Sequence, residues 1–418
     1  MITGAAKYPF LRWWQTRLIL LFLSLALLSS IISNDLPLYT KIENTHLFPA
    51  LRMLWDQHHV ATIESPNGSI NIDYTRSDWR IQEMQFVVWP LIPYSAKNID
   101  ASNRSYNSPW EAQYLEKESE KIRLGFRLRH YLGTDSVGRD IAAGMLSGLR
   151  ISLGIGFLAI LFAAAIALLF GSLSGYYGDQ LLRFHPAPLA LSAALLLWPA
   201  YLLLHALPNV LFVHSAPLRL LVAFMFLLLL AWLFVLLYRL FSNKLPSKRS
   251  YYLPLDSLIS RFTEIFDSLP KFLLILTLAV VIGRSVFWVA LVIGLNGWAS
   301  ISRLLRAEVL KNRNMEYTQA ALSSGMSHMR VLFRHVVPNA IGPFLVSISL
   351  GIGTAIIFES NLSFLGLGLP VDNVSWGSMI YQGKNNMNAW WLLLFPTLAI
   401  FTTIYTFNSL AERIRKQN

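Results

Sequence analysis

The chain alternates long apolar runs with short polar stretches, which is the pattern of a protein that crosses a membrane several times. A helix needs about 20 apolar residues to cross the hydrocarbon core of a bilayer. Apolar runs of this kind lie at about residues 17–33, 150–174, 187–208, 218–241, 264–283, 286–303, 339–358 and 390–410. Each run keeps its charged residues near its ends, where inserting a charge costs least. The pattern therefore predicts an all-α integral membrane protein with about eight transmembrane helices.

Two of these predictions have alternatives. The run at 17–33 follows a basic start and could be a cleaved signal peptide, but no small-x-small cleavage site follows it, so we interpret it as an uncleaved first spanning helix. Between the runs 264–283 and 286–303, the residues Gly283, Arg284 and Ser285 either form a tight external turn or place an arginine inside the membrane. The combined stretch is long enough for two passes, and we therefore predict the turn.

Eight crossings place both ends of the chain on one side of the membrane. Positive residues collect in cytoplasmic loops, so their positions test this topology. The basic residues of the short connections and the tail all fall on the side assigned to the cytoplasm: Lys244, Lys248, Arg249, Arg303, Arg306, Lys311, Arg313, Arg330, Arg334, Arg413, Arg415 and Lys416. We therefore predict a cytoplasmic N-terminus with the first helix at 1–36, an extracytoplasmic domain at 37–148, and a transmembrane domain at 149–418.

Composition supports a lipid environment. The chain has 418 residues, of which 54% are hydrophobic and 14% charged, whereas soluble domains carry about 25% charged residues. The net charge of +12 does not indicate nucleic acid binding, because the basic residues lie between apolar runs and not in one soluble patch. There is no cysteine, which excludes disulfides, thiolate metal sites and cysteine nucleophiles.

The segment at 37–148 contains tryptophans and hydrophobic runs, which favour a small folded domain over disorder. Its pair His58–His59, close to Asp56, has the residue types of a metal site. Adjacent histidines usually point in different directions and no third ligand is obvious, so we predict no metal site here.

The stretch EYTQAALSSGMSHMRVLFRHVVPNA, Glu316–Ala340, is polar and basic although it lies between two apolar runs. So many charges cannot lie in lipid. Good helix formers precede Gly325, which is placed to end a helix with a positive φ, and Ser327 is placed to cap a second helix. Pro338 suits the start of the next spanning segment. In the second helix, Met329, Leu332 and Phe333 would form an apolar face. The residues alone predict two short helices at an angle, which either project into the cytoplasm or form an ordinary surface loop.

The spacing Gln319-Ala320-Ala321, Gly325 and His335-Val336-Val337-Pro338 resembles the EAA loop of ATP-binding-cassette (ABC) importer permeases. Four further motifs resemble the same family in the same order: LGTDSVGRDIAAGMLSGLRISLGIG from residue 132, GSLSGYYGD from 171, FDSLPKFLLIL from 266, and ESNLSFLGLGLP from 359 with SWG from 375. The spelling RHVVPNA is similar to the oligopeptide, dipeptide and nickel branch, and YQGKNN from 381 to the microcin C and oligopeptide permeases.

This resemblance implies a type I ABC importer permease fold, with six family helices and the coupling loop at about 303–338. The chain departs from the family in three ways. Gln319 replaces the usual glutamate of the loop, a two-helix hairpin is inserted at about 180–250, and the ending LAERIRKQN lacks the usual DPR. An even number of inserted helices leaves the topology unchanged.

No GxxxxGK[ST] phosphate-binding loop occurs in the sequence, and neither HExxH nor GxSxG is present. We therefore expect no catalytic residues, no metal and no cofactor bound by this chain, with ATP used by a partner subunit. The resemblance implies ABC ATPase subunits, a second homologous permease and a periplasmic solute-binding protein as partners, in a bacterial inner membrane. It implies that the chain forms the path for peptides or peptide-like solutes.

The resemblance and the charges together suggest three sets of site residues. The ATPase-coupling candidates are Glu316, Gln319, Ala320, Ala321, Gly325, Arg330, Arg334, His335 and Pro338. The translocation-path candidates are Glu359, Asn361 and Ser363, because an ionisable residue at membrane depth is usually functional. The candidates for docking a binding protein are Asp135, Arg139 and Asp140, which could equally form ion pairs within the chain.

Two other function classes remain as alternatives. An integral membrane transferase acting on lipid-linked substrates would need acidic or histidine clusters at a membrane face, and none is evident in the sequence. A non-transporting scaffold or sensor would leave the helix–Gly–helix stretch unexplained.

Overall fold

A computed structural model describes residues 13–42, 45–52, 60–65, 68–73, 79–80, 85–117, 120–184, 229–230, 232–233, 235–237, 239–240, 251–282, 284–370 and 372–416. The His58–His59 pair, the apolar run at 187–208 and most of the run at 218–241 lie outside these ranges. The chain divides into two units, one made of residues 1–172 and 263–418 and the other of residues 173–262. Each unit is described separately.

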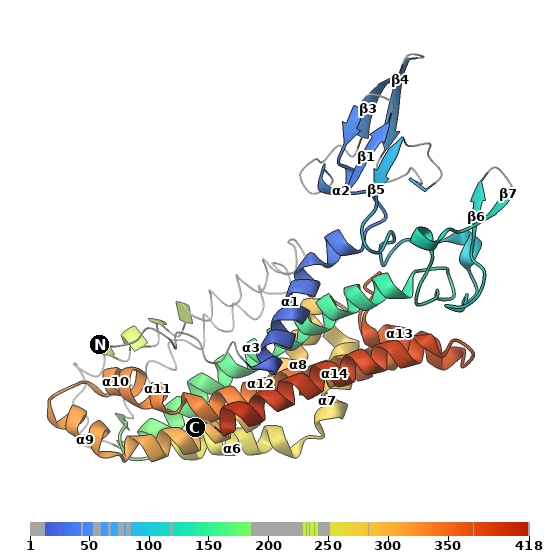
Figure 1. Ribbon diagram of the computed structural model, residues 1–418. Helices are drawn as coiled ribbons and strands as arrows, with labels where there is room; N and C mark the ends of the chain where they lie inside the picture. Colours follow the sequence, from blue (N-terminus) through green and yellow to red (C-terminus); the bar gives the residue numbers. More distant parts are fainter. Residues whose placement is uncertain are drawn as a thin grey trace. The chain divides into compact units, whose positions relative to one another are not determined.

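The larger unit is mainly helical (Figure 1). Within the described residues, five helices are long and apolar enough to cross a membrane. They are α1 (Trp14–Ile32), α3 (Ile141–Tyr177, whose last turn enters the other unit), α8 (Val286–Arg313), α12 (Ile341–Phe364) and α14 (Trp391–Arg415). These helices confirm the predicted helical membrane fold, whereas the number of eight stays a prediction. Helix α7 ends at Ile282 and α8 starts at Val286, with Ser285 as its N-cap and Arg284 exposed. Gly283 lies outside the described residues, and the external turn stays a prediction.

The run at 264–283 is not one helix, and this part of the prediction is wrong. It is divided between α6 (Leu255–Ser268) and α7 (Lys271–Ile282). The break falls at Pro270, which has no N–H to donate and whose ring would clash with the preceding turn of a continuous helix. The length of the apolar run also did not indicate that α6 begins at Leu255, before the predicted start of the run at about residue 264.

Helices α3, α7, α8 and α12 share one apolar core. Its buried members are Ile155, Ala159, Ile275, Ala279, Val289, Ala290, Val292, Ile293, Ala355 and Leu362. Small residues let α3 and α8 approach closely: a Cβ atom at Gly294 would lie 2.6 Å from the carbonyl oxygen of Ala159. Close approach through small residues is how helices pack inside membranes, where van der Waals contact replaces the hydrophobic effect.

Helix α1 packs on α14. The Gln15 side chain donates a hydrogen bond of 2.9 Å to Ser409 Oγ, and the rings of Trp14 and Tyr405 stack with centroids 6.0 Å apart. Helix α13 (Trp376–Asn385) precedes α14 and starts with a capping box between Ser375 and Ser378.

The segment after α1 contains short antiparallel strands. Strands β1 (Tyr39–Ile42), β2 (Thr45–Leu47) and β5 (Phe86–Val88) form a sheet in the order β2-β1-β5, whereas β3 (Val60–Ser65) pairs with β4 (Gly68–Asp73) and β6 (Tyr114–Lys117) with β7 (Glu120–Arg123). A single turn of helix, α2 (Pro49–Arg52), and two 3-10 turns, η2 (Ala101–Asn103) and η3 (Phe126–Leu128), complete it. Leu36, Leu47, Ala50 and Trp79 form a small core. The described part of this segment is therefore folded, as predicted, and its regular structure is mainly β-strand.

In the smaller unit, β8 (Arg183–Phe184) pairs with β9 (Tyr251–Tyr252). The Arg183 guanidinium lies over the Tyr252 ring at 5.0 Å. Ser257 donates hydrogen bonds to Asp179 from its backbone N–H and its hydroxyl, at 2.9 and 2.6 Å.

Candidate functional site

The polar stretch forms two short helices with a turn between them. Helix α9 (Glu316–Ser323) follows α8, and α10 (His328–Val331) continues into the π-helical turn η4 (Leu332–Val336) and then α11 (Val337–Asn339). Figure 1 shows these elements at the end of the bundle where α8 stops and α12 starts. Gly325 has φ +85°, the left-handed conformation predicted for it. Ser327 occupies the N-cap position of α10, but its side chain makes no capping hydrogen bond.

Helix α9 is held to the end of α8 by polar side chains. The buried Thr318 hydroxyl donates to the Asn312 carbonyl at 2.8 Å, and the Tyr317 hydroxyl donates to Asn312 Oδ1 at 2.8 Å. The amide of Gln319 donates to the Arg313 carbonyl at 3.2 Å. A glutamate at position 319 has no N–H to make this last bond. Gln319 therefore gives this chain a hydrogen bond that the usual family residue would not form.

The second helix presents an exposed face of mixed apolar and basic character. Met329 and Phe333 are 52% and 56% exposed, and Arg330 and Arg334 are exposed beside them. We call these four residues the projecting surface. On the opposite side Val331, Leu332 and Val336 are completely buried. The apolar face expected from Met329, Leu332 and Phe333 is thus divided, with Leu332 anchoring the helix and the other two facing outward.

The remaining coupling candidates are distributed around the same two helices. Glu316, Gln319, Ala320, Gly325 and Pro338 are exposed, His335 is half-buried and Ala321 is buried. Large apolar side chains in an exposed position next to arginines are typical of protein contact surfaces.

Glu359 lies in a buried polar cluster that joins three parts of the chain. Its Oε2 accepts a hydrogen bond from Ser152 of α3 at 3.1 Å, and its Oε1 accepts one from Ser363 of α12 at 2.9 Å. Ser375, the N-cap residue of α13, donates from its hydroxyl to Ser363 Oγ at 3.3 Å. Glu359 is fully buried, and the structure brings it together with Ser363 but leaves the third candidate, Asn361, exposed on another face of α12.

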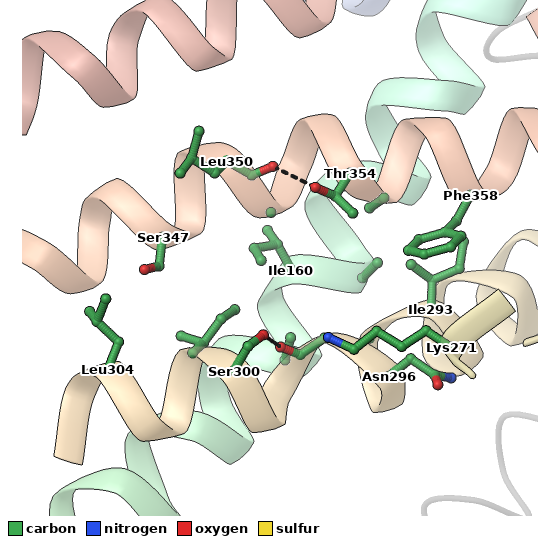
Figure 2. A pocket seen from close by; sticks show the side chains of 17 residues that line it. Ile160, Lys271, Ile293, Asn296, Ser300, Leu304, Ser347, Leu350, Thr354 and Phe358 are labelled. Atoms are coloured by element: carbon green, nitrogen blue, oxygen red, sulfur yellow. Dashed lines mark hydrogen bonds between the residues drawn. The ribbon is translucent and has the colours of Figure 1, made fainter. Parts of the chain in front are cut away.

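A groove of about 340 Å³ lies between α3, α8 and α12, and Lys271 of α7 reaches into it (Figure 2). Its walls combine small residues with Ile160, Ile293, Leu304, Leu350 and Phe358, and its polar side chains are Lys271, Asn296, Ser300, Ser347 and Thr354. Volumes of 300–1,000 Å³ are common for sites of small solutes. The sequence motifs did not point to this groove, and Glu359 does not line it.

The residues expected to dock a partner serve the fold. Asp135 accepts hydrogen bonds from the backbone N–H groups of Val137 and Arg139 at 2.9 and 2.8 Å, which closes a turn. Asp140 accepts one from Ala143 N at 2.7 Å and so caps α3. Both carboxylates are only 3% exposed, and Arg139 is half-buried.

Asp140 also belongs to a buried charged network that the sequence did not reveal. His130 lies between Asp140 (Nδ1 to Oδ1, 2.9 Å) and Asp100 (Nε2 to Oδ2, 3.4 Å), and Arg80 pairs with Asp100 at 2.8 Å. The Tyr94 ring stacks on the His130 ring with centroids 4.0 Å apart. These residues are far apart in the sequence, so no local pattern could have indicated the network.

The pKa values in this network are shifted by the fold. Burial alone would raise the pKa of Asp100, but the hydrogen bond from His130 and the charge of Arg80 outweigh it and lower the pKa to about 2. Burial alone would lower the pKa of His130, but its hydrogen bonds to Asp100 and Asp140 outweigh it and raise the pKa. Burial also raises the pKa of the Tyr94 hydroxyl.

A pH dependence of stability follows from these pKa values. The raised pKa of His130 contributes stability that is complete below its unfolded value of about 6.5 and is lost as the pH rises through the folded value. The lowered pKa of Asp100 contributes stability that is present above about 3.8 and lost as the pH falls towards 2.

We expect amide hydrogen exchange around Asp100 and His130 to be slowest between about pH 4 and 6.5, after correction for intrinsic rates. His130→Gln should remove the alkaline loss, and the control His335→Gln should keep it; equal profiles in both variants would contradict the expectation.

The C-terminal part of the chain matches a known family. Residues 246–417 match the family described as binding-protein-dependent transport system inner membrane component. The matched region contains α6 to α14, and with them the projecting surface, Glu359 and the α8 and α12 walls of the groove.

Several curated proteins are similar to the chain. The inner membrane ABC transporter permease protein YejE of Escherichia coli is 26% identical over 409 residues, which cover 96% of this chain and 91% of that protein. The oligopeptide transport system permease protein OppC of Bacillus subtilis is 27% identical over 68% of this chain and 70% of its own length. OppC of Salmonella typhimurium is 35% identical over a shorter region, 38% of this chain and 54% of its own. Residues 246–417 thus match this permease family, and the chain is similar to ABC transporter permeases over most of its length; its long apolar helices and these inner-membrane relatives indicate a multi-pass inner-membrane protein.

Proposed function

We propose that this chain is one of two permease subunits of an ATP-driven importer for peptides or peptide-like solutes, and that it couples to a separate ATPase through the segment Glu316–Asn339. The observation that carries the proposal is the projecting surface, which exposes Met329 and Phe333 beside Arg330 and Arg334 next to a helix–Gly–helix turn. Exposed apolar residues rimmed by charges fit a groove on a protein partner. The relatives named as oligopeptide and dipeptide permeases support the solute class.

The proposed coupling has a direct structural route. Helix α9 is hydrogen-bonded to the end of α8, and η4 continues through α11 to the start of α12. The buried Leu332 and Val336 hold η4 in place, so a movement of the projecting surface would move the ends of α8 and α12. These two helices form walls of the groove. Rocking of helices around a fixed site is the general basis of alternating access.

The partners and the orientation follow from the same proposal. Two ATPase subunits would bind and hydrolyse ATP, a second homologous permease would complete the path, and a periplasmic binding protein would deliver the solute. The N- and C-termini and the projecting surface would face the cytoplasm, because the basic residues of 303–334 and of the C-terminal tail lie on that side of the predicted topology. Glu359 and Ser363 would position α13 against α3 and α12, and would act on the path through those helices.

Purification of the chain from its native membrane tests the proposal. We expect an ATPase, a second permease and a binding protein to accompany it, and the reconstituted complex to accumulate peptides only when ATP is supplied on the side of the projecting surface. A chain that purifies alone, and membranes that take up peptides equally well without it, would contradict the proposal.

Gly325→Val is expected to weaken the coupling without preventing insertion. A Cβ atom at Gly325 would meet nothing within 4 Å, so the cost is only that of holding a β-branched residue at φ +85°, on the order of 1–2 kcal/mol. The turn between α9 and α10 would then rearrange. Co-purification of the ATPase and peptide uptake should both fall, whereas Gly125→Val, which also meets nothing within 4 Å but has no positive φ, should change neither.

A further inference from the structure

The groove between α3, α8 and α12 contains a lysine that neither the family region nor any motif assigns to a function. Lys271 begins α7, immediately after Pro270, and its side chain lies among the groove residues (Figure 2). Asn296 and Ser300, which line the same groove, stand about 15 and 21 Å from the Val286 end of α8 at about 1.5 Å per residue. In a hydrocarbon core about 30 Å thick, this is the middle of the membrane.

A charge at this depth is costly unless it faces a cavity or a partner. The ion pair that Lys271 makes is with Asp267, at 3.5 Å. Asp267 is held more closely by Arg303, at 2.6 Å. Two cations therefore share one carboxylate, which leaves a net positive charge beside the groove. The Lys271 side chain is 40% exposed, so its ammonium group is accessible to a solute.

The other polar groups of the groove are mainly hydrogen-bond acceptors. The hydroxyls of Ser300 and Thr354 donate to the carbonyls of Gly297 and Leu350 in their own helices, at 3.3 and 3.1 Å. The Asn296 side chain donates to the Val292 carbonyl at 2.8 Å. The hydroxyl oxygens and the Asn296 amide oxygen therefore retain lone pairs for a solute, and the Asn296 amide keeps one further N–H.

One cationic donor together with several acceptors and apolar walls matches a particular chemistry. A peptide with a free carboxyl end has an anion for the ammonium group, backbone N–H groups for the acceptors, and side chains for the walls formed by Ile160, Leu350 and Phe358. Resting on the proposed function, we infer that Lys271 binds the carboxylate of the solute during passage, so that the groove selects peptides or peptide-like molecules with a free carboxylate over their uncharged analogues.

Transport by the reconstituted complex, purified with its partner subunits, tests this inference. The probes are trialanine and trialanine amide, and the variants are Lys271→Met, Lys271→Arg and, as a control outside the groove, Lys384→Met. For each peptide, kcat/KM of the variant is divided by kcat/KM of the unchanged protein. A preference of the binding protein for one peptide affects both values equally and cancels in this ratio. ATPase activity and thermal stability of each complex are measured in parallel.

We expect Lys271→Met to lower kcat/KM for trialanine roughly tenfold more than for the amide, because a charge-assisted hydrogen bond is lost only with the free acid. Lys271→Arg should restore most of the difference, and Lys384→Met should show none. An equal decrease for both peptides, or no decrease for either, would overturn the inference and leave the proposed function standing. If the unchanged complex accumulates neither peptide, the proposed function fails, and the inference fails with it.

Discussion

Replacing Met329 and Phe333 together with aspartate is expected to abolish ATP-driven uptake while the chain still inserts and folds. Both side chains are more than half exposed and point away from the buried anchors Leu332 and Val336, so the fold does not depend on them. In the proposed complex they would enter a groove of the ATPase subunit. The double variant would remove two apolar anchors and bring two carboxylates into a contact that uses apolar side chains, which weakens association on the order of a hundredfold or more.

The measurement is the amount of ATPase that co-purifies with the tagged chain, together with peptide uptake by the reconstituted complex. Met387→Asp and Leu91→Asp are matched controls, because these side chains are 72% and 81% exposed in other parts of the chain. Both controls should retain ATPase and uptake. Normal uptake by the double variant would show that the projecting surface is not needed for coupling, whichever ATPase is the partner.

The projecting surface also shows what the sequence could predict. The helix before Gly325, the positive φ at Gly325 and a second helix after it all follow from local rules, and the structure contains them. In the second helix Leu332 is buried, whereas Met329 and Phe333 are exposed. This difference depends on the π-helical conformation of η4 and on its packing against α8. A π-helical turn shifts the period of the side chains, so a pattern based on 3.6 residues per turn assigned all three to one face.

The groove is the opposite case, since it arises only when α3, α7, α8 and α12 are assembled. In the sequence, Lys271 lies inside the apolar run predicted at 264–283, and the hydrophobic pattern gives it no role. Because Pro270 breaks the run, α7 starts there and Lys271 reaches into the bundle. Similarly, Glu359 was identifiable as an ionisable residue at membrane depth, but its partners Ser152 and Ser375 lie in distant parts of the chain.

The acidic candidates Asp135 and Asp140 show a different limit. Their motif was recognisable, and polar residues ahead of a spanning helix fit both a docking site and a helix cap. The distances to Val137, Arg139, Ala143 and His130 show capping and pairing within the chain. A residue pattern gives the groups that are available, whereas burial determines which of them a partner could reach.

Gly294→Ala is expected to destabilise the helix bundle, whereas Gly297→Ala on the same helix is not. A Cβ atom at Gly294 would lie 2.6 Å from the Ala159 carbonyl oxygen and 2.9 Å from Phe162 Cβ, so α3 and α8 would have to separate. Overpacking of this kind costs about 1–3 kcal/mol. At Gly297 the nearest atom is Ala163 Cβ at 3.5 Å, which is ordinary contact, and alanine is the better helix former by about 1 kcal/mol.

The two variants form a matched pair because both glycines line the groove and each substitution adds one methyl group to it. Thermal unfolding of the purified chain in detergent should show a lower midpoint for Gly294→Ala and an unchanged or higher midpoint for Gly297→Ala. Equal midpoints would mean that α3 and α8 leave room for a Cβ atom at Gly294, in contrast to the 2.6 Å between that atom and the Ala159 carbonyl oxygen. Since these helices form two walls of the groove, that outcome would also mean that the groove is wider at Gly294 than the described contact allows.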